Sequence, residues 1–413
     1  MANYRTAYII LDILTVMLFV ALYLPQFVLL SYHYQIEGLL ALGIAMIIFH
    51  FDKFKMLRAN SFLAILIVFL AFSLLIPLFS GHTVIFNRYL SMTVSTIFLF
   101  VCLFNEKYRG NHVNMRLLLV LFVIVLYPFI NTLAALINNS YTVRAIKSTM
   151  EEGDASFIAA QNGIMGYPLV YSVLLAHIIV LFVLQNRKSL RIKNFPLLVL
   201  LVFLVASFFL ILLSNFFTAL AILLLADLAI IVAVRQRWAL IAFIPVIILY
   251  LIFSDSINDF IVDAVASFLP EGKTVDRLDA IAHGGSSLGE LDSRALANKA
   301  SIDLISRFPF TGYILHYDFD LENVGQHSYV LDTLAFYGVF IGFLPILFFA
   351  SMFMYFYRKS TISILNRFTV VFFLAAAVLL LRNNYTSTIG LMLFFVFPAV
   401  HCFYLDRSAE IKQ

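Results

Sequence analysis

Charged residues are scarce in this sequence. Asp, Glu, Lys and Arg make up 12% of the 413 residues, whereas apolar residues make up 63%. A typical soluble domain is about a quarter charged and about half apolar, so water is not the main solvent of this chain. The net charge of +4 is diffuse, and no run of basic residues alternates with aromatics. This pattern argues against nucleic acid as a partner.

Cysteine and recognisable metal-binding patterns are also nearly absent. Cys102 and Cys402 each lie in an apolar run, and we read them as small core residues rather than as a disulfide framework. The sequence has no H-E-x-x-H pattern and no cluster of ligand residues at metal-binding spacing. The only acidic D-x-D pair outside the predicted spans is Asp318 with Asp320. We therefore predict no metal site and no cofactor.

The apolar residues form long blocks, which favour helices in a lipid bilayer over a barrel. The first block, 7–30, has no cleavage signal and is expected to remain as a span. The run 195–234 is long enough for two crossings, with a hairpin at Ser214 and Asn215. We predict an all-α polytopic membrane protein, a single transmembrane domain (1–413) with about 12 transmembrane helices. These lie near 7–30, 35–51, 61–79, 88–104, 117–137, 168–185, 195–214, 216–234, 238–254, 328–357, 368–381 and 388–405.

Basic residues predict the orientation of these helices. Of the 27 Lys and Arg residues, eighteen fall at the two termini or in alternate loops. Such loops remain on the cytoplasmic side of a membrane. Both termini are therefore expected in the cytoplasm, and the remaining loops outside.

Two long segments then lie outside: a first external loop, 138–167, and a large external loop, 255–326. The larger one is too long for a simple connection, and it carries twelve acidic against five basic residues. We expect short helices in it, and we place the functional site there.

One helix in the large loop is predicted in more detail. Ser293 is a candidate N-cap for a helix from Arg294 to Arg307, which Pro309 and Gly312 terminate. Helical spacing puts Ala295, Ile302 and Ile305 on one face, and Arg294, Asn298 and Ser301 on another. On this reading Arg294 faces an open cavity.

A few arginines in an acidic setting suggest anion binding, because a guanidinium group pairs with phosphate oxygens through two hydrogen bonds. For each arginine taken singly, pairing with a nearby acid or contact with lipid headgroups is the alternative. The candidate diphosphate-binding residues are Arg144, Arg277, Arg294, Arg88 and Arg382.

The chain re-enters the membrane at His327, Ser328 and Tyr329. A neutral imidazole at this boundary is suited to accept a proton from an attacking hydroxyl group, although an ordinary interfacial histidine is an equal reading. Asp332 lies about one helical turn further on, and an acid within a span is a candidate for function or for an ion pair with Arg382 or Arg88. Tyr329 and Asp332 are therefore candidate supporting residues.

Gly338 and Gly342 form a small-xxx-small step in the same predicted span, which allows close helix packing or a break. We favour packing.

Other polar residues within apolar runs leave a second class open. A proton-coupled transporter needs such residues along a path, and Asp12, His177, Asp227 and His401 are available. They are scattered in the sequence, however, and no paired broken helices accompany them.

The order of residues in and after the large loop resembles the O-antigen polymerase and ligase superfamily. Its members show an external arginine helix, a Pro-x-x-Gly turn, and a His that begins a span with a later Gly. The corresponding residues are Arg294, Pro309, Gly312, His327 and Gly338. The residue after the His is Ser328, where the family often has Asn, and the R-x10-G spacing of a polymerase motif is absent.

This resemblance implies a GT-C-like multi-span glycosyltransferase without a metal ion. It would act at the outer face of a bacterial plasma membrane on an undecaprenyl-diphosphate-linked oligosaccharide. Arg294 and Arg144 would neutralise the leaving diphosphate, and His327 would act as the base. A polymerase is the first expectation, with a chain-length regulator and a flippase as candidate partners. A ligase and a lipid-linked oligosaccharide flippase are the alternatives.

Overall fold

A computed structural model describes residues 2–30, 33–53, 55–56, 63–71, 83–138, 155–190, 194–214, 216–235, 289–315 and 328–412. Every regular element in this part of the chain is helical. The long helices of the bundle are α1 (Ala2–Tyr23), α3 (His33–Asp52), α6 (Thr83–Tyr108), α7 (Asn111–Asn138), α10 (Tyr167–Gln185), α11 (Asn194–Leu213), α12 (Phe217–Arg235) and α19 (Ser363–Arg382). The predicted all-α class is confirmed for the described residues.

Within the described residues, seven helices are long and apolar enough to cross a membrane, or eight if a bent pair is one span. The predicted count of about twelve is not reached within the described ranges. The expected span 238–254 and most of the span 61–79 lie outside them, so the higher count stays a prediction. The apolar run 195–234 does divide into two helices, α11 and α12, where a hairpin was expected.

The surface of α11 shows why such helices belong in lipid. Leu198, Val202, Val205 and Phe209 are all exposed, and their spacing places them on one face of the helix. Water would penalise a continuous apolar stripe of this kind, whereas hydrocarbon does not. The helix has satisfied its backbone hydrogen bonds internally, as a lipid-exposed segment must.

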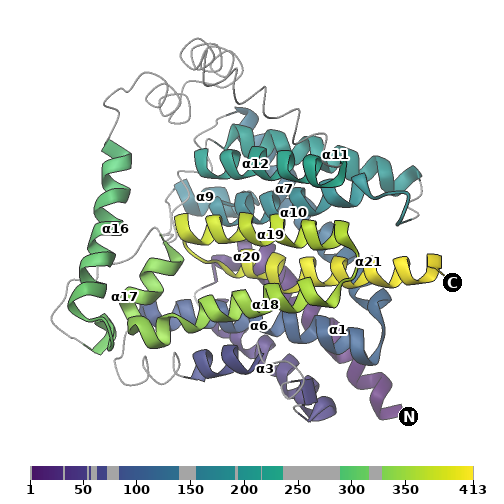
Figure 1. Ribbon diagram of the computed structural model, residues 1–413, viewed down its shortest axis with the longest axis horizontal. Coiled ribbons are helices and arrows are strands. Elements are labelled where there is room, and N and C mark those ends of the chain that lie inside the picture. The colour runs from purple at the N-terminus through teal and green to yellow at the C-terminus, as the bar shows by residue number, and fades with distance from the viewer. Residues whose placement is uncertain are drawn as a thin grey trace.

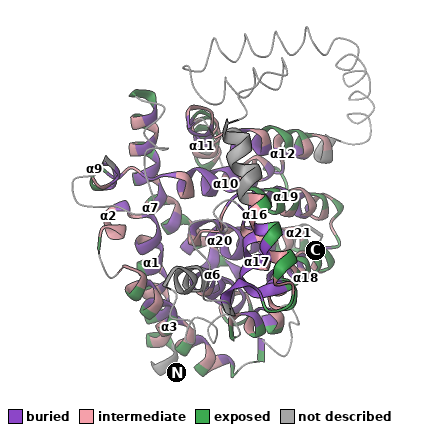
Figure 2. Cartoon of the chain, turned by 90° about the vertical axis from the view of Figure 1, so that its left-hand side faces the viewer, coloured by how far each residue is buried: buried purple, intermediate pink, exposed green. Residues whose placement is uncertain are grey.

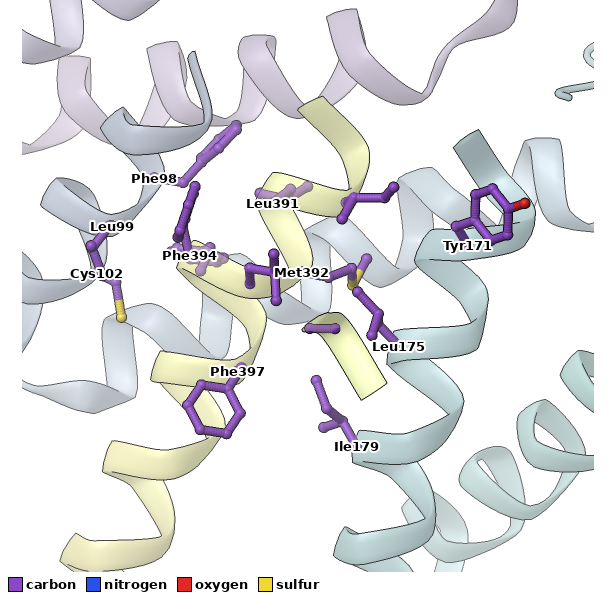
Figure 3. Packing of buried hydrophobic residues seen from close by; sticks show 14 of the residues in the cluster. Phe98, Leu99, Cys102, Tyr171, Leu175, Ile179, Leu391, Met392, Phe394 and Phe397 are labelled. Carbon is purple, nitrogen blue, oxygen red and sulfur yellow. The ribbon is translucent and has the colours of Figure 1, made fainter. Parts of the chain in front are cut away.

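The centre of the bundle is formed by the C-terminal helices. α20 (Ser387–Leu391), a π-helical turn η3 (Met392–Val396) and α21 (Phe397–Lys412) follow one another, and α20 and η3 pack against α6 and α10. Figure 3 shows Leu391, Met392 and Phe394 between the side chains of these two helices. The close packing continues at Phe397, whose ring is stacked on that of Phe372 with centroids 4.5 Å apart.

The two ends of the bundle differ in chemistry. At the end where both termini lie, on the right of Figure 1, acidic and basic side chains pair. Arg109 binds both carboxylate oxygens of Asp12, at 2.7 and 2.6 Å, and the ammonium group of Lys107 lies 2.7 Å from Asp52. Lys359 pairs with Glu106 at this same end. The opposite end carries α9 (Ala155–Gln161), α16 (Gly289–Arg307) and the start of α17 (Tyr329–Gly342).

The predicted span 328–357 is not one straight helix. It consists of α17 and α18 (Leu344–Lys359), which are bent by 76° relative to one another. Within α17, Gly338 has φ 73° and ψ 172°, which is not helical. Close packing or a break was predicted at Gly338 and Gly342, with packing favoured, and Gly338 shows both: it breaks the helix, and a Cβ atom there would lie 2.3 Å from the carbonyl oxygen of Phe310. Gly342 lies against the backbone of Thr333 and Leu334 on the other side of this break.

Candidate functional site

A turn after α16 is docked directly on the break in α17. Gly312 has φ 68°, and a Cβ atom there would lie 2.2 Å from the carbonyl oxygen of Phe336. A Cβ atom on Gly338 would lie 2.3 Å from the carbonyl oxygen of Phe310. The backbone N–H of Val339 donates to the carbonyl oxygen of Pro309 at 2.7 Å. Both glycines are therefore required by positive φ and by close backbone approach.

We expect Gly338→Ala to separate this turn from α17. Its new methyl group would meet a backbone carbonyl oxygen, and its φ of 73° is unfavourable for alanine, so a destabilisation of about 1–3 kcal/mol or more is expected. The measurement is thermal unfolding in lipid nanodiscs. Gly43→Ala is the matched control, because its Cβ atom would meet only the side chain of Leu14, at 3.3 Å. Equal melting temperatures for the two variants would contradict the proposed role of Gly338.

The start of α16 and its buried face differ from the sequence prediction. The helix begins at Gly289, so Ser293 lies inside it and is not its N-cap, although the helix ends at Arg307 as expected. Ser301 is 1% exposed, whereas Ile302 is 50% exposed. The inward face of α16 is thus mixed: Leu304 is buried beside Ser301, and Ile305 of the predicted apolar face packs partly buried against the core. Ser301 has a buried partner on α17.

That partner is Asp332. It is 1% exposed, and its Oδ1 accepts a hydrogen bond from the Ser301 hydroxyl group at 3.2 Å. Burying a carboxyl group is costly unless it is hydrogen-bonded, so this contact fixes the rotation of α16 about its axis. Arg382, one of its two predicted partners, is exposed at the end of α19. The position of Arg294 is seven residues before Ser301 and shares its face by helical spacing.

The first turn of α17 is held by two other helices. Ser328 caps it by accepting the backbone N–H of Leu331 at 3.2 Å. The backbone N–H of Tyr329 donates to the carbonyl oxygen of Asn383, the residue after Arg382, at 3.1 Å. The Tyr329 hydroxyl group lies 3.8 Å from the sulfur of Met92 on α6.

This end of α19 is itself anchored. The Tyr171 hydroxyl group donates to Asn383 Oδ1 at 2.6 Å, and Thr388 donates to the carbonyl oxygen of Pro168 at 3.1 Å. The ring of Tyr385 lies 5.2 Å from that of Tyr329. Burial raises the pKa of the Tyr385 phenol well above its ordinary value, so it stays neutral. These contacts connect the helix ends around Tyr329, and much of α17 is coloured as buried in Figure 2.

The structure describes the predicted site residues to different extents. Tyr329, Asp332 and Arg382 are fully described and lie at this one end of the bundle. Arg294 lies in α16 and Arg88 in α6, one helical turn before Met92, but only the backbone of these two residues is described. The remaining candidates, His327, Arg144 and Arg277, lie outside the described residues.

Although His327 itself is not described, its neighbour Ser328 is buried at the start of α17. Three helices that carry arginine residues, α6, α16 and α19, thus lie near the start of α17 at this end of the bundle. Among the described residues, no three His, Cys, Asp or Glu side chains are grouped so that they could hold a metal ion. The basic residues of α16 are Arg294, Lys299 and Arg307, and guanidinium groups bind phosphate oxygens in a fixed geometry.

Three residues of this site were not predicted from the sequence. Asn383, Tyr385 and Tyr171 come from different segments, and nothing in their local spacing indicates that they meet. The one available signal was the polar stretch between α19 and α20, because loops next to spans often carry functional residues.

No protein-family model matches the sequence, and a search of curated proteins finds no match.

Proposed function

We propose that the protein is a polymerase of bacterial surface polysaccharide, such as O-antigen, capsule or exopolysaccharide. It would transfer a glycan from an undecaprenyl-diphosphate-linked donor to the next lipid-linked repeat unit. One observation carries the proposal: Pro309, Gly312 and Gly338, which the sequence suggested as motif positions, are in backbone contact. Their contact joins the turn after the Arg294 helix to the break in α17, the helix that follows His327.

The chemistry of transfer fits this arrangement. When the lipid diphosphate leaves, its developing negative charge must be neutralised by fixed cations if no metal ion is present. Arg294, with Arg144, Arg277, Arg88 and Arg382, supplies guanidinium groups for that purpose. His327 takes the proton from the attacking sugar hydroxyl group as general base.

The position of the site suits a substrate that is half lipid. Phe310 and Phe340 are 66% and 69% exposed and stacked with centroids 5.5 Å apart, beside the turn that joins α16 to α17. Exposed phenylalanine rings suit contact with hydrocarbon. The lipid chain of a membrane-anchored carrier would supply such a contact.

The proposal also assigns the orientation of the helix bundle in the membrane. Lys107, Arg109, Lys359 and both termini lie at one end of the bundle, which we assign to the cytoplasm by the distribution of basic residues. The opposite end, with α16, then faces outward from the plasma membrane.

Cells that lack the protein test the proposed function. A polymerase mutant is expected to accumulate single lipid-linked repeat units on the outer face, with no long glycan. A ligase mutant would instead accumulate long lipid-linked chains, and a flippase mutant would retain single units on the inner face. Normal chain lengths in the mutant cells would contradict the proposal.

A further inference from the structure

Glu37 is a buried acid outside the set of site residues described above. It lies one helical turn after the start of α3 and is 6% exposed. The other buried residues in this part of α3 follow it at helical spacing: Leu40, Ala41, Ile44 and Ile48. Glu37 therefore begins the stripe of α3 that faces the interior of the bundle, and it is not turned toward lipid.

The carboxyl group of Glu37 has no partner in the fold. No described residue gives it a hydrogen bond or a salt bridge. Burying a carboxyl group without such partners is costly, and a leucine here would continue the apolar stripe without that cost. The small exposed fraction of Glu37 includes its carboxyl oxygens, because these are not among the fully shielded, unpaired polar atoms of the described residues. An acid of this kind within a span is a candidate for binding a ligand.

The packing of α3 against α6 places Glu37 at the end of the bundle that carries the candidate site. The rings of Phe49 and Phe100 lie 5.6 Å apart, and further along both helices Asp52 lies 2.7 Å from Lys107. The two helices are therefore parallel. The pair Asp52 and Lys107 is at the end where both termini lie. Glu37 is fifteen residues before Asp52, or roughly 22 Å along the helix, and so lies toward the opposite end.

The same register relates Glu37 to the start of α17. Twelve residues before Phe49 is Glu37, and twelve residues before Phe100 is a position of α6 one turn before Met92. These two positions lie at a similar depth, because parallel helices rise equally per residue. The sulfur of Met92 lies 3.8 Å from the Tyr329 hydroxyl group. Glu37 and Tyr329 thus approach α6 within about one turn of each other in depth.

Two phenols connect Glu37 to the candidate site by a second route. Tyr34 precedes Glu37 on α3 and is within electrostatic reach of both Glu37 and Tyr167. The ring of Tyr167, at the start of α10, lies 6.1 Å from that of Tyr171. Tyr171 in turn donates to Asn383 in the candidate site. Both Tyr34 and Tyr167 are half-buried, so part of each side chain remains open to a ligand.

A carboxyl group beside phenols suits a sugar. A carboxylate accepts hydrogen bonds from two neighbouring hydroxyl groups, and a phenol adds a flat apolar face with a hydroxyl group that donates or accepts. Ligand sites in general combine such apolar and aromatic surface with a few polar groups that fix the orientation of the ligand. The proposed transfer reaction brings a glycan with free hydroxyl groups to this end of the bundle.

We propose that Glu37 binds the acceptor sugar. Its carboxyl group accepts hydrogen bonds from hydroxyl groups of the terminal sugar on the incoming lipid-linked repeat unit, beside Tyr34. This inference rests on the proposed function and names the residue that selects the acceptor, while the role of base stays with His327. The sugar would then supply the hydrogen bonds that the fold leaves unmade. The burial of Glu37 is thus costly in the empty protein and is compensated when the acceptor is bound.

Transfer by purified variants in lipid nanodiscs tests the contact. The donor is a longer lipid-linked glycan, and the acceptors are lipid-linked repeat units of the cell's own polysaccharide, complete or lacking one hydroxyl group of the terminal sugar. Glu37→Leu should raise KM for the complete acceptor about 10- to 100-fold with little change in kcat, and Glu37→Gln, which keeps one acceptor oxygen, should be intermediate. Gln35→Leu, at an exposed position of α3, is the control and should match the wild type.

The acceptors that lack a hydroxyl group make the test specific. Removal of the hydroxyl group that Glu37 binds should raise KM in the wild type but not further in Glu37→Leu. Equal losses in both proteins for every such acceptor, or an unchanged KM in Glu37→Leu, would overturn the proposal while the proposed function stands. If the wild type transfers no glycan, the proposed function fails and this inference fails with it.

Thermal unfolding without acceptor separates binding from a structural role. Because the fold gives Glu37 no partner, Glu37→Leu should shift the melting temperature upward relative to the wild type, and Gln35→Leu should leave it unchanged. A structural acid would behave in the opposite way, because its removal would leave a partner unpaired. A lower melting temperature for Glu37→Leu, or failure of this variant to fold, would overturn the proposal.

Discussion

Replacing Arg294 by alanine should abolish polymer formation while the protein still inserts into the membrane. The position of Arg294 shares the α16 face that carries Ser301, which is bonded to Asp332 at the start of α17. Loss of a guanidinium group there would remove the fixed charge that we propose neutralises the leaving diphosphate. Arg294→Lys should restore little activity, because an ammonium group cannot reproduce the two parallel hydrogen bonds of the guanidinium fork. The measurement is the glycan length distribution in cells that express each variant.

The controls for Arg294 come from the same helix. Arg307→Ala changes an exposed arginine at the end of α16 and should leave polymer length unchanged. Insertion is checked with Asp303→Cys, an exposed position that an impermeant thiol reagent should label from outside. Cys102 and Cys402 are buried and free, so they give little background. Normal polymer from the lysine variant would count against recognition of a diphosphate.

His327→Ala should slow transfer by about two to four orders of magnitude, the usual contribution of a general base. Binding of the lipid-linked donor should change little, because the proposed role of His327 is on the acceptor hydroxyl group and not on the diphosphate. The effect should therefore appear in kcat and not in KM. The measurement is steady-state transfer with purified variants over a range of donor concentrations.

His112→Ala is the matched control for His327. His112 is exposed at the start of α7, on the end of the bundle that carries the termini, and its loss should not change the transfer rate. If His327→Ala retained full turnover, the base would have to be another group.

The sequence predicted the helices well, but it predicted their breaks poorly. Long apolar runs bounded by charge determine where helices lie, so α10, α11 and α19 could be located within a few residues. Gly338 and Gly342 were read as a packing step because the spacing of small residues carries no information about φ. Only the approach of the Phe310 carbonyl oxygen to Gly338 shows that the backbone turns there.

Contacts between helices were the least predictable feature. Ser301 was placed on the correct face of α16, but that face was expected to border an open cavity, because its partner Asp332 is 31 residues away. His177 on α10 and Asp227 on α12 were treated as scattered polar residues for the same reason, but the His177 Nε2 atom lies 3.2 Å from Asp227 Oδ2. Each sits on its own helix, and its partner depends on how the helices rotate relative to one another. Hydrophobic periodicity cannot determine that rotation in helices that are apolar on all sides.

The central claim is most directly tested by transfer with the purified protein in lipid vesicles. The only glycan substrate is a synthetic undecaprenyl-diphosphate-linked oligosaccharide, and the reaction is followed with and without EDTA. The account predicts a doubled glycan on one lipid together with free undecaprenyl diphosphate, at the same rate in both conditions. Failure to form any longer glycan, or complete dependence on a divalent ion, would contradict it.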